Sequence, residues 1–184
     1  MRASYKVIIG IGVVVLLVAA GIGGYLLGGD GDADETTAKD EIRVGVPVIV
    51  SVAELEQFAG DHEQVYWAGE RPGTHIELTL TARNGIFVRY LPVDVKAGAK
   101  GEYLTVATYS AVEGYRNLAS AKKSAADVTR TQSGAVVAVF KKQPLSTYFA
   151  FPDGAFQIEV YSPVKGESEK LVSDGTVALL GNTP

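Results

Sequence analysis

An uninterrupted apolar run of 21 residues, at positions 7–27, constrains this chain more than any other feature. An α-helix needs about 20 such residues to cross the hydrocarbon core of a bilayer, so the run predicts a transmembrane helix. Arg2 and Lys6 precede it, and four acidic residues follow within positions 30–35. Because basic residues favour the cytoplasmic side, we expect residues 1–6 to form a cytoplasmic tail and the remainder to lie outside the cell membrane.

A cleaved signal peptide is the alternative interpretation of this run. Val18, Ala19 and Ala20 form a small-residue segment of the kind that signal peptidases cleave. The chain stays apolar beyond them to position 27, and aromatic residues at both ends of the run favour the membrane interface. We therefore expect an uncleaved, single-pass anchor.

Small residues recur at four-residue spacing in this region, at Ala20, Gly24 and Gly28. Such spacing lets two membrane helices approach closely, which makes this stripe a candidate surface for a homodimer. Glycine is also frequent in membrane helices in general, so the pattern has a second explanation.

The rest of the chain divides into a short linker and one domain. Residues 28–41 are rich in Gly, Asp, Thr and Glu and lack large apolar side chains, which predicts a flexible acidic tether. Residues 42–184 have the size of one domain and contain the single tryptophan and all six phenylalanines. The chain has no cysteine, which excludes disulfides and zinc–thiolate sites and is ordinary for a bacterial envelope protein.

Charge is unevenly distributed along the chain. The formal net charge is −4, but residues 94–142 contain 8 basic and 4 acidic side chains, a net charge of +4. The overall sign and the expected address argue against nucleic acid as a partner. The basic middle could contact anionic lipid or wall polymer, although a solvated surface explains it equally.

Apolar periodicity, capping boxes and turn dipeptides predict an α+β domain with a mainly antiparallel sheet and two to three short helices. Capping boxes at Ser51–Glu54 and Ser110–Glu113 predict helices that end near residues 60 and 124, and Pro163 opens a third helix that ends at Asp174. We expect strands at residues 42–50, 64–68, 75–82, 86–91, 103–109, 134–141, 147–151, 156–161 and 176–180.

Residues 42–92 and 103–163 repeat the order strand, Ser-x-x-Glu helix, strand and hairpin. Corresponding landmarks are offset by a nearly constant number of residues, which predicts an internal duplication of a βαβββ unit. Turn signals also recur by chance, so the duplication remains a hypothesis.

Two turn dipeptides determine the expected pairing within the hairpins. A two-residue turn at Asp153-Gly154 makes Phe149 face Ile158 and Thr147 face Val160. The opposite face of that hairpin then carries Tyr148, Gln157, Glu159 and Tyr161. The same logic at Asn84-Gly85 groups Arg89 with Leu78, Leu80, Phe87 and Leu91. An arginine on such a face must pair, extend to solvent or indicate another register.

The sequence contains no recognisable catalytic or cofactor motif. A Ser-x-x-Lys match at Ser120 lies inside a predicted helix and lacks its companion motifs, so it does not indicate a penicillin-binding enzyme. His62 and His75 lie in different settings, whereas a metal site usually needs three converging ligands. We predict a non-enzymatic protein without a metal or cofactor.

The candidate binding residues are Tyr66, Trp67, Glu70, Arg71 and Tyr90. Aromatic rings beside charged loop residues can stack on a sugar or hold a peptide. The alternative is that Trp67 packs in the core and the Glu-Arg pair lies in a solvated loop.

Four segments, at residues 65–69, 86–92, 104–109 and 156–161, resemble a family of uncharacterised bacterial single-pass membrane proteins with an exported α+β domain. The resemblance implies the same address and architecture and carries no activity. We therefore expect a membrane-anchored extracytoplasmic domain that binds another envelope protein or a wall polymer. The alternatives are a hydrolase of envelope polymers with an unrecognised site and a structural subunit of an envelope complex.

Overall fold

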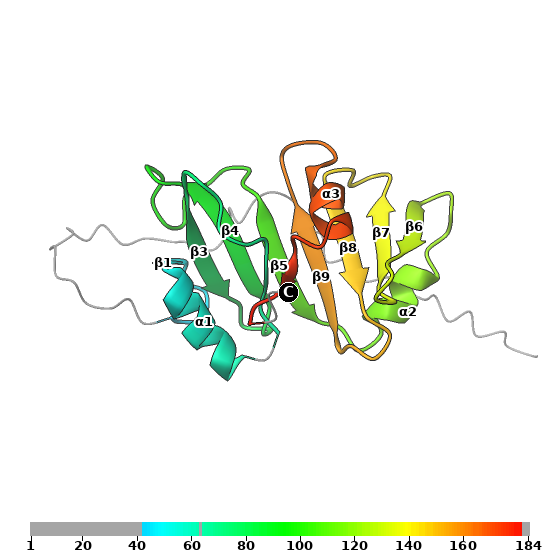
Figure 1. Cartoon of the computed structure of the whole chain (residues 1–184), viewed down its shortest axis with the longest axis horizontal. Helices are drawn as coiled ribbons and strands as arrows, with labels where there is room; N and C mark the ends of the chain where they lie inside the picture. Colours follow the sequence, from blue (N-terminus) through cyan, green and yellow to red (C-terminus); the bar gives the residue numbers. More distant parts are fainter. Residues whose placement is uncertain (1–41, 63, 182–184) are drawn as a thin grey trace, which may run out of the picture.

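A computed structural model describes residues 42–62 and 64–181 of the chain (Figure 1). The predicted tail, membrane span and tether lie outside these residues, as do Ala20, Gly24 and Gly28. Within the part that is described, no helix is both long and apolar enough to cross a membrane.

The domain is built on an eight-stranded sheet in the order β1-β3-β4-β5-β9-β8-β7-β6, in which every paired neighbour is antiparallel. Its strands are β1 (Val48–Val50), β3 (Thr74–Leu80), β4 (Ile86–Pro92), β5 (Thr105–Ser110), β6 (Ala126–Arg130), β7 (Val136–Phe140), β8 (Ser146–Ala150) and β9 (Phe156–Tyr161). A second, two-stranded sheet pairs β2 (Tyr66–Trp67) with β10 (Ala178–Leu179). The described helices are α1 (Val52–Asp61), α2 (Gly114–Ala119) and α3 (Glu167–Ser173). The predicted α+β class and mainly antiparallel sheet are confirmed.

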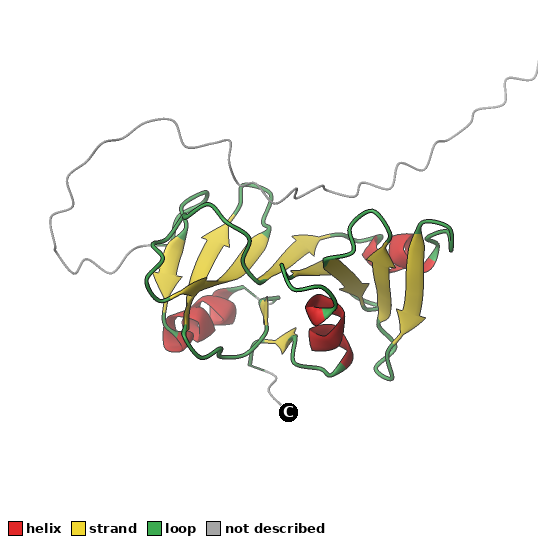
Figure 2. Cartoon of the chain, turned by 90° about the horizontal axis from the view of Figure 1, so that it is seen from above, coloured by secondary structure: helices red, strands yellow, loops and turns green. Residues whose placement is uncertain are grey.

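The two faces of the large sheet are covered differently. Figure 2 shows α1, α3 and the small sheet on one side and α2 on the other. We call the first side the core face, because the main hydrophobic core lies there. Fully buried members of that core are Leu55, Leu78, Val88, Val106 and Val160. Burial of such side chains stabilises a fold by about 1.5–3 kcal/mol each.

We call the opposite side the tyrosine face. It carries the odd-numbered residues of β5 and β9 together with Tyr148 of β8, because side chains alternate along a strand. At one end α2 covers it, where Leu118 packs in a small cluster with Val136, Ala138 and Tyr148. At the other end the connection at residues 93–104 contacts β3 and β4.

Helix α1 begins as the sequence predicts. The hydroxyl of Ser51 accepts a hydrogen bond from the backbone N–H of Glu54, and the carboxylate of Glu54 accepts one from the backbone N–H of Ser51. This capping box satisfies two amides that the first helical turn leaves free. The helix then buries Leu55 and Phe58 against the core face.

The predicted register of the first hairpin is wrong. Leu80 pairs with Ile86, so the connection has five residues, and Arg89 faces Glu77 rather than the apolar group with Leu78. The cause is the turn: the hydroxyl of Thr81 accepts from the N–H of Gly85, and Asn84 takes a left-handed conformation with φ 56°. A shift by an odd number of positions moves each side chain to the other face.

Arg89 instead forms a buried ion pair across the two strands. Its Nη1 lies 2.6 Å from Oε1 of Glu77, whose side chain is 0% exposed. The 93–104 connection contacts both partners: Arg89 donates to the carbonyl of Ala99, and the N–H of Gly98 donates to Glu77. The guanidinium also lies over the ring of Tyr103, 5.1 Å from its centroid. The ion pair therefore fixes the connection to the sheet.

The predicted helix over residues 110–124 is also wrong in extent. Strand pairing continues through Ser110, and the N–H of Ala111 donates to the carbonyl of Ala155. Ser110 is consequently not available as a helix cap, and α2 spans only Gly114–Ala119. The following segment forms β6, a strand that the sequence analysis missed.

Replacing Ser51 with alanine should lower the free energy of unfolding by about 1 kcal/mol, since one capping hydrogen bond is lost. Urea denaturation of the S51A variant measures this effect. Ser124→Ala, in the exposed connection before β6, is the matched control and should change stability by less than about 0.5 kcal/mol. Equal stability of S51A and the native chain would contradict the role of the cap.

Replacing Arg89 with methionine should lower the free energy of unfolding by about 3–5 kcal/mol, because the buried carboxylate of Glu77 loses its counter-charge. The double variant E77Q/R89M should recover a large part of that loss in the same denaturation experiment. A double variant as unstable as R89M would show that packing of the arginine, rather than charge pairing, dominates.

Candidate functional site

The centre of the tyrosine face contains a buried carboxylate held by hydroxyl groups. Glu159 lies in the middle of β9, is 5% exposed, and pairs with Ala107 on one side and Tyr148 on the other. Its Oε1 accepts hydrogen bonds from Ser146 at 2.8 Å and from Tyr148 at 2.9 Å, and its Oε2 accepts one from Tyr109 at 3.2 Å. The small side chain of Ala107 leaves room for this arrangement beside Glu159.

One further side chain completes the set. The hydroxyl of Tyr148 also lies 3.3 Å from Oε1 of Gln143, in the connection between β7 and β8. We call Tyr109, Gln143, Ser146, Tyr148 and Glu159 the Glu159 cluster. Its members come from three strands and one turn, so it forms only when the sheet is complete.

The Glu159 cluster has no cationic partner among the described residues, since none of their four ion pairs includes Glu159. Burial raises the pKa of the Glu159 carboxyl, although its three hydrogen bonds act in the opposite direction. Burial and the nearby carboxylate together raise the pKa values of Tyr109 and Tyr148. Burial without a counter-charge makes the ionised carboxyl more costly than it is in water, which is the cause of the raised pKa.

Further half-buried aromatic residues lie on the same side of the sheet. Tyr161 follows Glu159 on the same face, and a nearby carboxylate, that of Glu102, adds to burial in raising its pKa. Tyr103 and Tyr115 contribute half-buried rings from the two flanking segments. The tyrosine face thus presents several aromatic side chains around one buried acid.

The structure places two of the sequence-predicted binding residues in the core. Tyr66 and Tyr90 are 8% and 3% exposed. The ring of Tyr66 packs edge-on against Phe149, and the hydroxyl of Tyr90 accepts a hydrogen bond of 2.7 Å from the N–H of Ala68. Both side chains are therefore largely shielded from solvent.

The other predicted residues differ from them in exposure, although the charge of Arg71 acts on the hydroxyl of Tyr90 and opposes the rise that burial causes in its pKa. Trp67 is half-buried against the core and pairs with Ala178 in the small sheet, whereas Glu70 is exposed. Arg71 donates to Glu167 at the start of α3, with 2.6 Å between Nη2 and Oε1. Trp67 therefore packs against the core, and Arg71 is in an ion pair.

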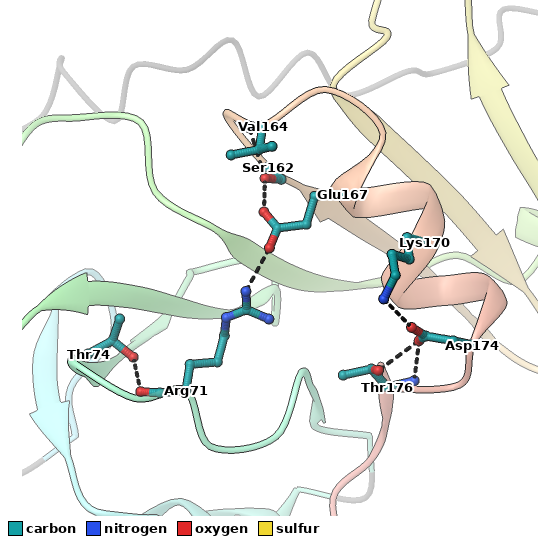
Figure 3. A network of polar contacts seen from close by, with 8 residues as sticks. All are labelled: Arg71, Thr74, Ser162, Val164, Glu167, Lys170, Asp174 and Thr176. Carbon is teal, nitrogen blue, oxygen red and sulfur yellow. Dashed lines mark hydrogen bonds and ion pairs between the residues drawn. The ribbon is translucent and has the colours of Figure 1, made fainter.

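That ion pair belongs to the network in Figure 3. The second oxygen of Glu167 accepts a hydrogen bond from the hydroxyl of Ser162, which in turn accepts one from the N–H of Val164. Because Arg71 lies between β2 and β3, the network joins this loop to the segment that connects β9 to α3. Its geometry is that of a structural contact between distant parts of the chain.

A separate contact closes the other end of α3. Asp174 accepts hydrogen bonds from the hydroxyl and the N–H of Thr176, which lower the pKa of its carboxyl, and it pairs with Lys170 (Figure 3). This exposed turn directs the chain from α3 into β10.

Sequence reasoning missed the Glu159 cluster as a site, although one signal for it was present. The second hairpin was expected to place Tyr148, Glu159 and Tyr161 on one face, and they do share it. Tyr109 could be added only by knowing that β5 pairs with β9, which no local pattern reveals.

Within residues 42–62 and 64–181 no group of three or more His, Cys, Asp or Glu side chains could hold a metal ion. His62 stacks on Phe58 with 3.9 Å between ring centroids, and His75 lies half-buried at the start of β3. The two histidines therefore have unrelated surroundings.

Comparison with known proteins gives no assignment: no family model, curated protein or solved structure matches this chain. The resemblance to single-pass membrane proteins consequently stays a prediction from the sequence.

The Glu159 carboxyl should give stability a characteristic pH dependence. Its pKa is raised in the folded protein, so the folded state binds the proton more tightly than the unfolded chain. The free energy of unfolding should fall as pH rises above the unfolded pKa, near 4.5, and level off above the folded pKa. Urea denaturation across this range measures the slope.

Glu159→Gln should remove that contribution, because the amide does not titrate. The free energy of unfolding of E159Q, relative to that of the native chain, should therefore be higher at neutral pH than at acidic pH. Glu169→Gln, at an exposed position of α3, is the matched control. Parallel stability curves for the native chain and E159Q would contradict the assignment.

Proposed function

We propose that this chain is a single-pass envelope protein whose exported domain binds a protein partner through the tyrosine face. The observation that carries this proposal is the distribution of side chains on that face. Its centre is uncharged at the surface and rich in tyrosine, and charged residues lie around it. Protein interfaces have this anatomy, with aromatic residues enriched and charges depleted at the centre.

The central strands supply the middle of the proposed interface. Thr105 pairs with Tyr161, and Tyr109 pairs with Gln157, and all four side chains are half-buried. Tyrosine suits such a position because its ring offers a large contact area.

The flanking segments supply the rim. The 93–104 connection carries exposed Lys96 and Lys100, and at the other end Arg116 and Arg130 are exposed. Charges at a rim affect the rate and specificity of association more than its strength.

The predicted membrane helix gives this interface its location. A helix at residues 7–27 and a tether at 28–41 would hold the domain close to the outer face of the membrane. In this proposal the anchor supports binding by confining the domain to two dimensions, and the stripe of Ala20, Gly24 and Gly28 allows the anchor to pair with itself. Duplication of a βαβββ unit is our preferred origin for the two halves of the domain.

The test places lysines at the centre of the proposed interface. The full-length chain should capture its partner protein from solubilised membranes. With the variant T105K/Q157K the captured amount of that protein should fall by at least about tenfold, because burying unpaired charge opposes association. The matched control T129K/Q57K makes the same changes at exposed positions of β6 and α1 and should capture the native set. Quantitative mass spectrometry measures both.

Direct contact is tested by a photo-crosslinking residue. Introduced at Gln157, it should attach to the same protein whose capture T105K/Q157K loses, whereas introduced at Gln57 it should not. Equal capture by both lysine variants would overturn the proposal. The proposal would also be overturned if the native chain and the control T129K/Q57K were retained on isolated wall polymer and T105K/Q157K were not. The ligand would then be a polymer.

A further inference from the structure

We propose that the Glu159 cluster is a proton-linked switch that controls the turn between β7 and β8. The basis is the position of one hydroxyl group. Oη of Tyr148 lies 2.9 Å from Oε1 of Glu159 and 3.3 Å from Oε1 of Gln143. A tyrosine hydroxyl has one proton, so Tyr148 can donate to only one of these two acceptors at a time.

When Glu159 is ionised, it can only accept hydrogen bonds. Tyr148 then donates to the carboxylate, as do Ser146 and Tyr109. The side-chain carbonyl of Gln143 is left without the proton of Tyr148.

When Glu159 takes up a proton from solvent, the hydrogen bond reverses its direction. The new O–H of Glu159 donates to Oη of Tyr148, and Tyr148 donates its own proton to Oε1 of Gln143. Tyr109 can still donate to the other carboxyl oxygen. One proton is gained, no covalent bond besides the new O–H changes, and the chain of hydrogen bonds now extends to the turn.

The turn is arranged to respond to this change. The N–H of Gln143 donates to the carbonyl of Phe140, and the N–H of Ser146 donates to the carbonyl of Gln143. Gln143 therefore lies at the middle of the turn, and Ser146, at its end, contacts Glu159 directly. Ser146 can donate to Glu159 in either state, so protonation should strengthen the turn through the added hydrogen bond from Tyr148 to Gln143, and ionisation should remove that bond.

The surroundings favour protonation of Glu159. Its neighbours on β5 and β8 are uncharged, and α2 brings Tyr115, whose hydroxyl interacts with Arg130 rather than with the cluster. The 93–104 connection brings Glu102 towards Tyr161. Glu102 has the same charge as ionised Glu159. The lysines of the turn itself, Lys141 and Lys142, are exposed. Burial without a cation raises the pKa of Glu159, in the same direction as the geometry requires.

Hydrogen exchange of the full-length chain tests the switch. Protection of the Gln143 and Ser146 amides, corrected for intrinsic exchange rates, should fall about two- to tenfold through a single midpoint as pH rises, the effect of one hydrogen bond of ordinary strength. In E159Q the amide does not titrate, so protection should be independent of pH. In Y148F the relay is cut, so protection should stay low and independent of pH.

The matched control E169Q should behave as the native chain does. Infrared spectra of the native chain give a measurement that needs no variant to fold: a protonated-carboxyl band should appear below the same midpoint. The switch is overturned if protection in the native chain does not change with pH, if the midpoint persists in E159Q or Y148F, or if the protonated-carboxyl band is missing.

Discussion

The pairing of β5 with β9 is the interaction on which the rest of the domain depends. It joins the three strands of the first half, β1, β3 and β4, to the three of the second half, β8, β7 and β6. Thr105 faces Tyr161 at one end and Ser110 faces Phe156 at the other, so the two strands are paired along their full length. Val106 and Val160 are buried on the core face, which gives the junction an apolar side as well as hydrogen bonds. Without this pairing the sheet would consist of two separate halves with exposed edges.

The same junction explains why the two faces differ in chemistry. On the core face it contributes valine and isoleucine to a continuous apolar cluster. On the tyrosine face it places Ala107 opposite Glu159, and the carboxylate of Glu159 accepts hydrogen bonds from hydroxyl groups of the neighbouring strands. A buried acid is a poor choice for stability alone, because an apolar residue of similar size would avoid the cost of desolvation. Its presence at the centre of the sheet is the reason to expect a functional role.

Local signals in the sequence predicted the elements that depend on local chemistry. The capping box at Ser51 is confirmed, and so is the facing of Phe149 with Ile158. The turn of that hairpin is centred on Pro152 and Asp153 rather than on Asp153-Gly154, because the N–H of Gly154 donates to the carbonyl of Phe151. The predicted register of the first hairpin was wrong because the hydroxyl of Thr81 closes a longer turn than the two-residue turn expected at Asn84-Gly85. Thr131 makes the same bond to the N–H of Ala135, in the turn that joins the missed strand β6 to β7.

What could not be predicted depends on contacts between distant segments. The start of the helix predicted at residues 110–124 was wrong because Ser110 is paired with β9 as part of a strand. Tyr66 and Tyr90 lie in the core because both belong to strands buried on that face, a fact that only the register reveals. The Glu159 cluster combines residues from three strands and a turn, so its chemistry becomes visible only with the strand order.

The small sheet has a consequence for the order in which the molecule can fold. Strand β10 pairs with β2, so Ala178 meets Trp67, and the N–H of Leu180 donates to the carbonyl of Val65. Val177 and Leu180 are both part of the main core. A growing chain therefore cannot finish that core until its last described strand has been synthesised and released. Until then the apolar surface around β2 is uncovered, and a molecule truncated before residue 177 would expose it to chaperones and proteases.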